Sequence, residues 1–89
     1  TGPLLGAFHE RGVRFLLCEG GPRLAAALLE AGAVDEVFLT HATLVTAEPG
    51  ARRLFEASRA LEREVRLEPV TLHRSSDGER YERSRLRYL

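Results

Sequence analysis

The segment from Val13 to Val45 constrains the fold more than any other part of this 89-residue chain. It begins with a nearly continuous apolar run, VRFLLC, which is typical of a β-strand covered on both faces. A glutamate, two glycines and a proline follow, and the sequence then takes on the spacing of an amphipathic helix. A second strand-like stretch, AVDEVFLTHATLV (residues 33–45), completes a strand, a helix and a strand. Because such a crossover is right-handed and joins parallel strands, the sequence predicts an α/β fold.

The boundaries of that helix are marked by residues with special backbone chemistry. Pro22 suits a first helical position, because its missing N–H would be unpaired there in any case. Leu24 and Leu28 stand at i, i+4 on one face, and Gly32 ends the helix near residue 31. An earlier helix is predicted from the apolar spacing in PLLGAFHE, with Gly12 as its left-handed C-terminal cap.

The second half of the chain predicts an antiparallel ending. Residues 65–73 have the pattern of a strand, and Pro69 inside them favours an edge position or a bulge. An Asp-Gly dipeptide then predicts a hairpin turn, after which RYERSRLRYL alternates so that Leu86 and Tyr88 share one face. Before this hairpin, a short helix is predicted around residues 54–55.

Composition argues against several classes of function. The thirteen basic and thirteen acidic residues cancel, whereas binders of nucleic acid or anionic membranes carry an excess of positive charge, so we expect neither partner. No apolar run approaches the roughly 20 residues needed to span a bilayer and no leader segment opens the chain, which predicts a cytoplasmic protein. The single cysteine, Cys18, lies in an apolar run and is predicted to be a small buried thiol. The three histidines lack the spacing of a metal site.

The junction before the predicted helix is the strongest candidate for a binding site. Ligands bind where the carboxyl end of a strand opens into a helix, because the unpaired N–H groups and the helix dipole favour an anion there. Gly20 and Gly21 allow a phosphate to approach the backbone, or allow backbone angles that other residues resist. Glu19 would repel a phosphate, so we expect it to face a hydroxyl-bearing or protonated substrate. A purely structural interpretation stays open, since a tight turn can use Gly-Gly-Pro for geometry alone and the G-x-G-x-x-G fingerprint is missing.

The run FLLCEGGPRLAAALLEAGAVDEVFL (residues 15–39) resembles the signature segment of a known family, the C-terminal reductase domain of the bifunctional riboflavin-biosynthesis deaminase/reductase. The E-G-G-P-x-L core followed by A-G-x-V-D-E is its most specific part, and the ending DGERYERSRLRYL resembles the family's final hairpin. The family is similar in fold to dihydrofolate reductase. The resemblance therefore implies a dihydrofolate-reductase-like α/β fold, of which this chain is the C-terminal half: a parallel strand-helix-strand unit followed by an antiparallel hairpin.

For function, the resemblance implies NADPH as cofactor and delivery of a hydride to the ribosyl group of 5-amino-6-(5-phosphoribosylamino)uracil. It assigns contact with this phosphoribosylamino-pyrimidine substrate to Glu19. It assigns the NADPH phosphates to the five residues that follow, Gly20, Gly21, Pro22, Arg23 and Leu24. No protein nucleophile is implied, because the nicotinamide supplies the hydride.

The chain departs from the family pattern in two respects. The proline and glycine-rich segment that the family has after the second strand is delayed in THATLVTAEPGARRLF, and a complete domain is longer than 89 residues. Residues 1–89 are therefore predicted to be one domain, the C-terminal fragment of a larger reductase domain, and not a competent reductase alone. The alternative is a non-catalytic α/β module that binds a nucleotide or self-associates. Uncovered apolar strands and an open hairpin edge predict a homodimer or higher oligomer, with the strand around Leu86 and Tyr88 at the interface.

Overall fold

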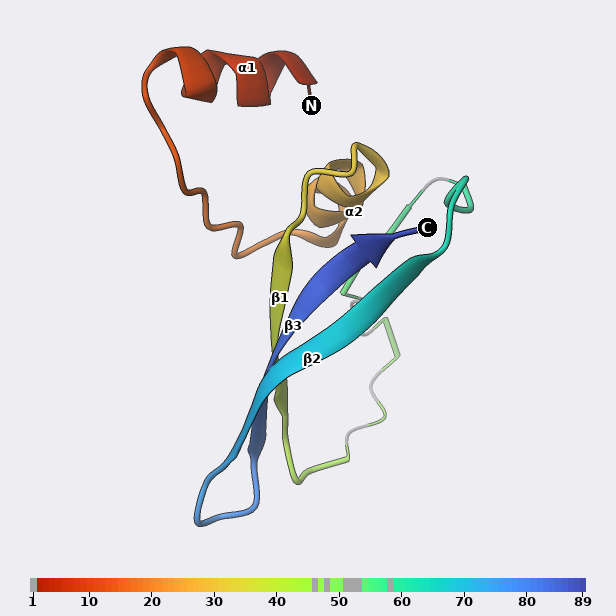
Figure 1. Ribbon diagram of the computed structural model, residues 1–89. Coiled ribbons are helices and arrows are strands. Elements are labelled where there is room, and N and C mark those ends of the chain that lie inside the picture. Colours follow the sequence, from red (N-terminus) through yellow and green to blue (C-terminus); the bar gives the residue numbers. More distant parts are fainter. Residues whose placement is uncertain (1, 46, 48, 51–53, 58) are drawn as a thin grey trace. The chain divides into compact units, whose positions relative to one another are not determined.

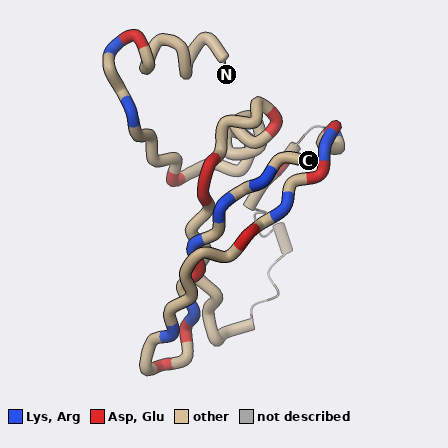
Figure 2. The backbone as a smooth tube through the Cα atoms, viewed as in Figure 1, with Lys and Arg blue, Asp and Glu red and all other residues tan. Residues whose placement is uncertain are grey.

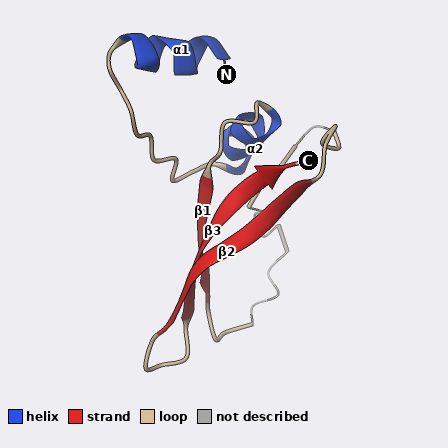
Figure 3. Cartoon of the chain, in the orientation of Figure 1, coloured by secondary structure: helices blue, strands red, loops and turns tan. Residues whose placement is uncertain are grey.

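The computed structural model describes residues 2–45, 47, 49–50, 54–57 and 59–89. The chain divides into two compact units, one formed by Thr1–Ala33 and Arg52–Leu61 and the other by Val34–Ala51 and Glu62–Leu89. Helices lie in the first unit and strands in the second (Figures 1 and 3). The described elements are α1 (Gly2–Glu10), α2 (Pro22–Glu30), β1 (Glu36–His41), β2 (Val65–Arg74) and β3 (Arg80–Tyr88).

Both helices end at the glycines that the sequence marked. After α2, the N–H of Gly32 donates to the carbonyl of Leu29 and the N–H of Ala33 donates to the carbonyl of Leu28, each at 3.0 Å. This Schellman closure needs a left-handed residue, and Gly32 supplies it with a φ of 67°. Gly12, with a φ of 80°, ends α1 in the same way. The predicted boundaries of the two helices are therefore confirmed.

The second unit contains a three-stranded antiparallel sheet in the order β1-β3-β2. Its β2–β3 hairpin confirms the predicted antiparallel ending, and Leu86 and Tyr88 lie opposite Leu67 and Val65 on a shared face. The hydroxyl of Tyr88 donates to the carbonyl of Val34 at 2.7 Å and accepts from its N–H at 3.0 Å. Partial burial raises the pKa of Tyr88, which keeps the hydroxyl protonated as a donor.

The hairpin has both the bulge at Pro69 and the Asp-Gly turn that were predicted from the sequence. The register of β2 against β3 shifts just after Pro69, and β2 is an outer strand of the described sheet, a position where proline is tolerated. At the turn, Gly78 has a φ of 91° and its N–H donates to the carbonyl of Ser75 at 3.1 Å. The N–H of Ser75 in turn donates to the carbonyl of Glu79 at 2.9 Å, which closes the loop.

The parallel strand-helix-strand unit is not confirmed. Residues 13–18 form no strand, and the strand pairs in the described part of the chain are antiparallel. No backbone hydrogen bond joins residues 14–19 to another described residue, and Phe15 and Leu17 are 94% and 73% exposed. A strand requires a neighbour to pair with, so this apolar run remains an open connection between α1 and α2 (Figure 1). Cys18 is exposed for the same reason, so the prediction of a buried thiol was wrong.

One further prediction is corrected by the structure, and the predicted interface through the strand around Leu86 and Tyr88 stays a prediction. The described residues 54–57 contain no helix, because two apolar side chains bury too little surface to offset the cost of helix nucleation. The strand around Leu86 and Tyr88 is β3, which is paired on both sides in the described sheet. Edge-to-edge association through β3 is therefore blocked, and the outer edges of this sheet belong to β1 and β2.

Candidate functional site

The predicted site lies where the open connection enters α2. Pro22 is the first residue of the helix, as expected, and Gly21 is its N-cap with φ −70° and ψ 172°. The carbonyl of Gly21 accepts the first helical bond, from the N–H of Ala25 at 3.0 Å. No side chain of the described residues caps this helix end. The N–H groups of Arg23 and Leu24 are therefore left for another acceptor, since the first-turn amides of a helix have no intrahelical partner.

Neither glycine of the junction is required by the backbone. Gly21 has an ordinary φ, and Gly20 is not among the glycines with a positive φ. A Cβ at either position would meet no atom within 4 Å, so open space lies in front of the backbone. The geometry-only interpretation therefore does not account for these two glycines. Open space, free amides and the helix dipole together fit an anionic group that approaches from outside, such as a phosphate.

Glu19 and Arg23 supply the charges beside this helix start. Both side chains are exposed, and neither forms an ion pair or a side-chain hydrogen bond with any described residue. The carboxylate of Glu19 is thus free to accept a hydrogen bond from a hydroxyl, and the guanidinium of Arg23 is free to contact an anion. Opposite charges thus stand at the two ends of the short segment from Glu19 to Arg23, and their roles toward substrate and phosphate stay predictions.

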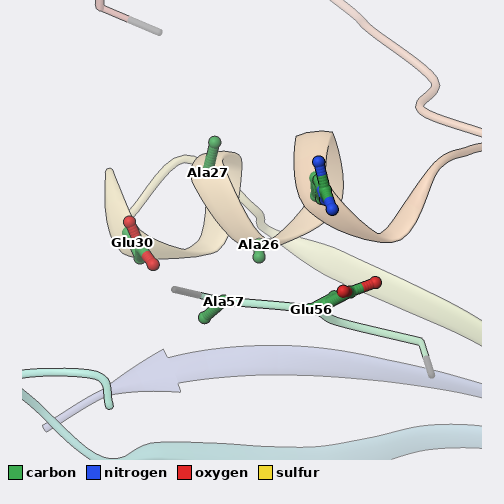
Figure 4. Close-up of a pocket in the computed structure, with 6 residues that line it drawn as sticks. Ala26, Ala27, Glu30, Glu56 and Ala57 are labelled. Atoms are coloured by element: carbon green, nitrogen blue, oxygen red, sulfur yellow. The ribbon is translucent and has the colours of Figure 1, made fainter. Parts of the chain in front are cut away.

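A groove of about 390 Å³ lies between α2 and the segment that carries Glu56 and Ala57 (Figure 4). Ala26 points from the helix toward the segment that carries Glu56 and Ala57. The N–H of Glu56 donates to the carbonyl of Pro22 at 3.0 Å, which fastens this segment to the start of the helix. The groove is lined by Arg23, Ala26, Ala27, Glu30, Glu56 and Ala57.

Arg23 is the single residue that this groove shares with the predicted site. Two carboxylates, of Glu30 and Glu56, line it with one guanidinium, so it does not suit a phosphate. Sequence reasoning missed Glu56, because its position depends on a long connection that returns to the helix and no local pattern marks such a return.

A family model for the RibD C-terminal domain matches residues 2–79 of the chain. The chain belongs to this family. The match to the RibD C-terminal domain includes both helices, β1, β2 and the whole junction from Glu19 to Leu24, and it confirms the resemblance carried by residues 15–39.

The fold of this RibD C-terminal domain is also found in a larger solved structure. The crystal structure of a pyrimidine reductase-like protein from Corynebacterium diphtheriae matches 97% of the chain with a TM-score of 0.83 and 24% sequence identity. The match covers 34% of that protein, so the chain spans about a third of its length. No curated protein sequence matches the chain. Among the described residues, no helix of this RibD C-terminal domain is long and apolar enough to cross a membrane.

Proposed function

We propose that this RibD C-terminal domain is the C-terminal part of an NADPH-dependent reductase of riboflavin biosynthesis. The reaction is hydride transfer to the ribosyl group of 5-amino-6-(5-phosphoribosylamino)uracil. The observation that carries the proposal is the family match over residues 2–79, with the uncapped, glycine-bordered start of α2 inside it. The similar fold of a pyrimidine reductase-like protein supports the same chemistry.

The start of α2 is the part of the chain that would hold the phosphates of NADPH. The N–H groups of Arg23 and Leu24 and the guanidinium of Arg23 are the donors, and Gly20 and Gly21 leave room for the phosphates. Pro22 sets the backbone angle of the first helical residue without adding a donor. When bound, NADPH supplies the hydride, so the task of the protein is to bind and orient the two reactants.

Glu19 is the proposed substrate contact. Its carboxylate accepts a hydrogen bond from a substrate hydroxyl, and its negative charge keeps it away from the phosphates held by the neighbouring amides. Because the chain spans about a third of the reductase-like structure, we propose that residues 1–89 act within a larger domain. There, residues 13–18 gain neighbouring strands and form the parallel strand-helix-strand unit. The apolar side chains on both faces of that run support this step.

A non-catalytic module that binds a nucleotide or self-associates is the second candidate. The observation in its favour is the same short coverage of the reductase-like structure. The two candidates differ in turnover within a larger domain, where only the reductase consumes NADPH when the pyrimidine is added. The 89-residue chain is expected to bind NADPH without oxidising it when the pyrimidine is added, and pyrimidine-dependent NADPH consumption by the chain alone would refute that expectation.

Calorimetric titration with NADPH tests the cofactor site. Gly21→Val places a branched side chain in the open space before the helix and should weaken NADPH binding by more than about tenfold. Gly6→Val is the matched control, because a Cβ at Gly6 also meets no atom within 4 Å and lies in α1. Equal affinities for the two variants and the wild-type chain, or no NADPH binding by the wild-type chain, would remove the cofactor from this site.

Substitution of Glu19 separates the substrate role from the cofactor role. Glu19→Gln keeps the size of the side chain and removes its charge, so it should weaken binding of the pyrimidine and leave the affinity for NADPH unchanged. In a reductase-competent domain the same change should lower kcat/KM for the pyrimidine. An unchanged kcat/KM would take Glu19 out of the site.

A further inference from the structure

The charges on α2 are placed in the reverse of the order that its helix dipole favours. Arg23 lies in the first turn, which contains no acidic residue, and Glu30 is the last residue of a final turn without a basic one (Figure 2). A cation at the start of a helix and an anion at its end both oppose the dipole. Neither side chain forms an ion pair with a described residue. Two unfavourable charges that nothing in the described chain balances are expected where side chains serve a ligand.

Both charges line the groove beside α2. Seven residues make nearly two full turns, so Arg23 and Glu30 lie on one face of the helix, about 10 Å apart along its axis. Ala26 and Ala27 lie between them on this face, and Ala26 is only 2% exposed. Ala57 lines the groove from the opposite segment. The groove is therefore lined by small apolar side chains in the middle and by a charge near each end.

Glu56 adds a second carboxylate near the start of α2. Its N–H donates to the carbonyl of Pro22 at 3.0 Å, which fixes the backbone of Glu56 beside the first turn. Figure 4 shows Glu56 and Glu30 toward opposite ends of the groove. Glu56 is exposed and forms no ion pair with Arg23 or with any other described residue. Within the described chain, one end of the groove thus offers a cation and an anion that are not paired, and the other end offers a single anion.

An amino acid with a basic side chain complements all three charges. Its carboxylate and α-ammonium are attached to the same carbon, so together they match the guanidinium of Arg23 and the carboxylate of Glu56. Its side-chain cation matches Glu30 and is also favoured by the negative end of the helix dipole. The aliphatic stem between the two ends covers the alanines, as the stems of lysine and arginine do on apolar surfaces of proteins. The single net positive charge of such a ligand balances the single net negative charge of the groove.

We propose that this groove binds a free basic α-amino acid, lysine or arginine, with its carboxylate on Arg23, its α-ammonium on Glu56 and its side-chain cation on Glu30. The groove volume lies within the range of about 300–1,000 Å³ that is usual for small-molecule sites. The order of the charges gives the ligand one orientation, because turning it end for end would bring its carboxylate to Glu30. The proposal needs no NADPH and is tested in its absence.

Titration of the ¹⁵N-labelled 89-residue chain with L-lysine and L-arginine, followed by the NMR shifts of its amides, tests this proposal. Both amino acids should give saturable shifts around Ala27, Glu30 and Glu56 below about 10 mM. Three lysine analogues each lack one recognised group: lysine methyl ester lacks the carboxylate, Nα-acetyl-lysine lacks the α-ammonium and norleucine lacks the side-chain cation. Each analogue should bind at least about tenfold more weakly than lysine, because each leaves one charge of the groove without a partner.

Two variants connect groups of the ligand to individual residues. Glu30→Gln should bind lysine and norleucine with similar affinity, because the side-chain cation has lost its partner. Glu56→Gln should likewise bind lysine and Nα-acetyl-lysine with similar affinity. A purely structural role for either glutamate would weaken all ligands alike and leave these ratios unchanged. Glu10→Gln, in α1 and outside the groove, is the control and should keep the preferences of the wild-type chain.

Circular dichroism of each variant shows whether the secondary structure is retained. The proposal would be overturned if neither amino acid gave saturable shifts up to about 10 mM, or if Glu30→Gln still preferred lysine over norleucine. Cadaverine, a diamine without a carboxylate, separates an amino acid from a polyamine as the occupant. If cadaverine bound as tightly as lysine, the carboxylate would not be recognised and the proposed class of ligand would be wrong.

Discussion

Replacing Gly21 and Gly32 by alanine in separate variants should change the free energy of unfolding in opposite directions. Gly32 has a φ of 67°, where an alanine is disfavoured by about 1 kcal/mol or more. Gly21 has a φ of −70° and a ψ of 172°, angles that alanine adopts without strain. Since a Cβ at either position would meet no atom within 4 Å, crowding contributes to neither variant. Gly21→Ala should therefore stabilise the chain by about 0.4–1 kcal/mol, because it reduces the freedom of the unfolded chain.

The two variants should differ by about 2 kcal/mol, which corresponds to roughly 10 °C between their thermal midpoints for a domain of this size. Thermal and urea unfolding followed by circular dichroism measure the difference. Gly6→Ala in α1 is the reference, because alanine in a helix interior is favoured over glycine by about 0.5–1 kcal/mol. If Gly32→Ala were as stable as the wild-type chain, the left-handed closure of α2 would be wrong. If Gly21→Ala were destabilised, the junction would have another geometry, and the loss of NADPH binding in Gly21→Val would lose its meaning.

Two further predictions concern the sheet. Tyr88→Phe removes both hydrogen bonds to Val34 and should lower the free energy of unfolding by about 1–3 kcal/mol in urea titrations, whereas an unchanged midpoint would contradict the bonds. The hydrogen bond from Arg83 lowers the pKa of Glu36, so this carboxylate contributes stability above its ordinary pKa of 4.5 and loses it as the pH falls through the lowered value. Unfolding measured from roughly pH 7 to pH 3 should show a shallower loss for Glu36→Gln than for the wild-type chain, and equal slopes would count against the pair.

The features that were predictable from the sequence are those that local chemistry decides. Gly12 and Gly32 are each left-handed because the closure of the preceding helix needs that conformation, and Pro22 begins a helix because it lacks a donor. Pro69 marks a bulge on an outer strand for the same local reason. In these cases the residue and its backbone state are linked without help from distant parts of the chain.

The features that were missed depend on partners far away in the sequence. The run VRFLLC has strand composition, yet no described segment pairs with it, so Phe15 and Leu17 are exposed and no strand forms. The central position of β3 depends on β1 pairing across the 38 residues that separate His41 from Arg80, which alternation within β3 does not reveal. Composition detects which surfaces are apolar, but it does not identify what covers them. At the candidate site, the junction from Glu19 to Leu24 was found from its motif, whereas the position of Glu56 required the structure.

Pro69 has a consequence for how this sheet can be enlarged. A ten-residue strand such as β2 normally offers its outer row of N–H and carbonyl groups as a template for another strand. A proline and a bulge in the middle of β2 interrupt that row, whereas β1 presents Glu36–His41 with neither proline nor glycine. The two edges are thus unequal, and strand addition is favoured outside β1. Members of the family with larger sheets are therefore expected to place their additional strands beside β1 and not beside β2.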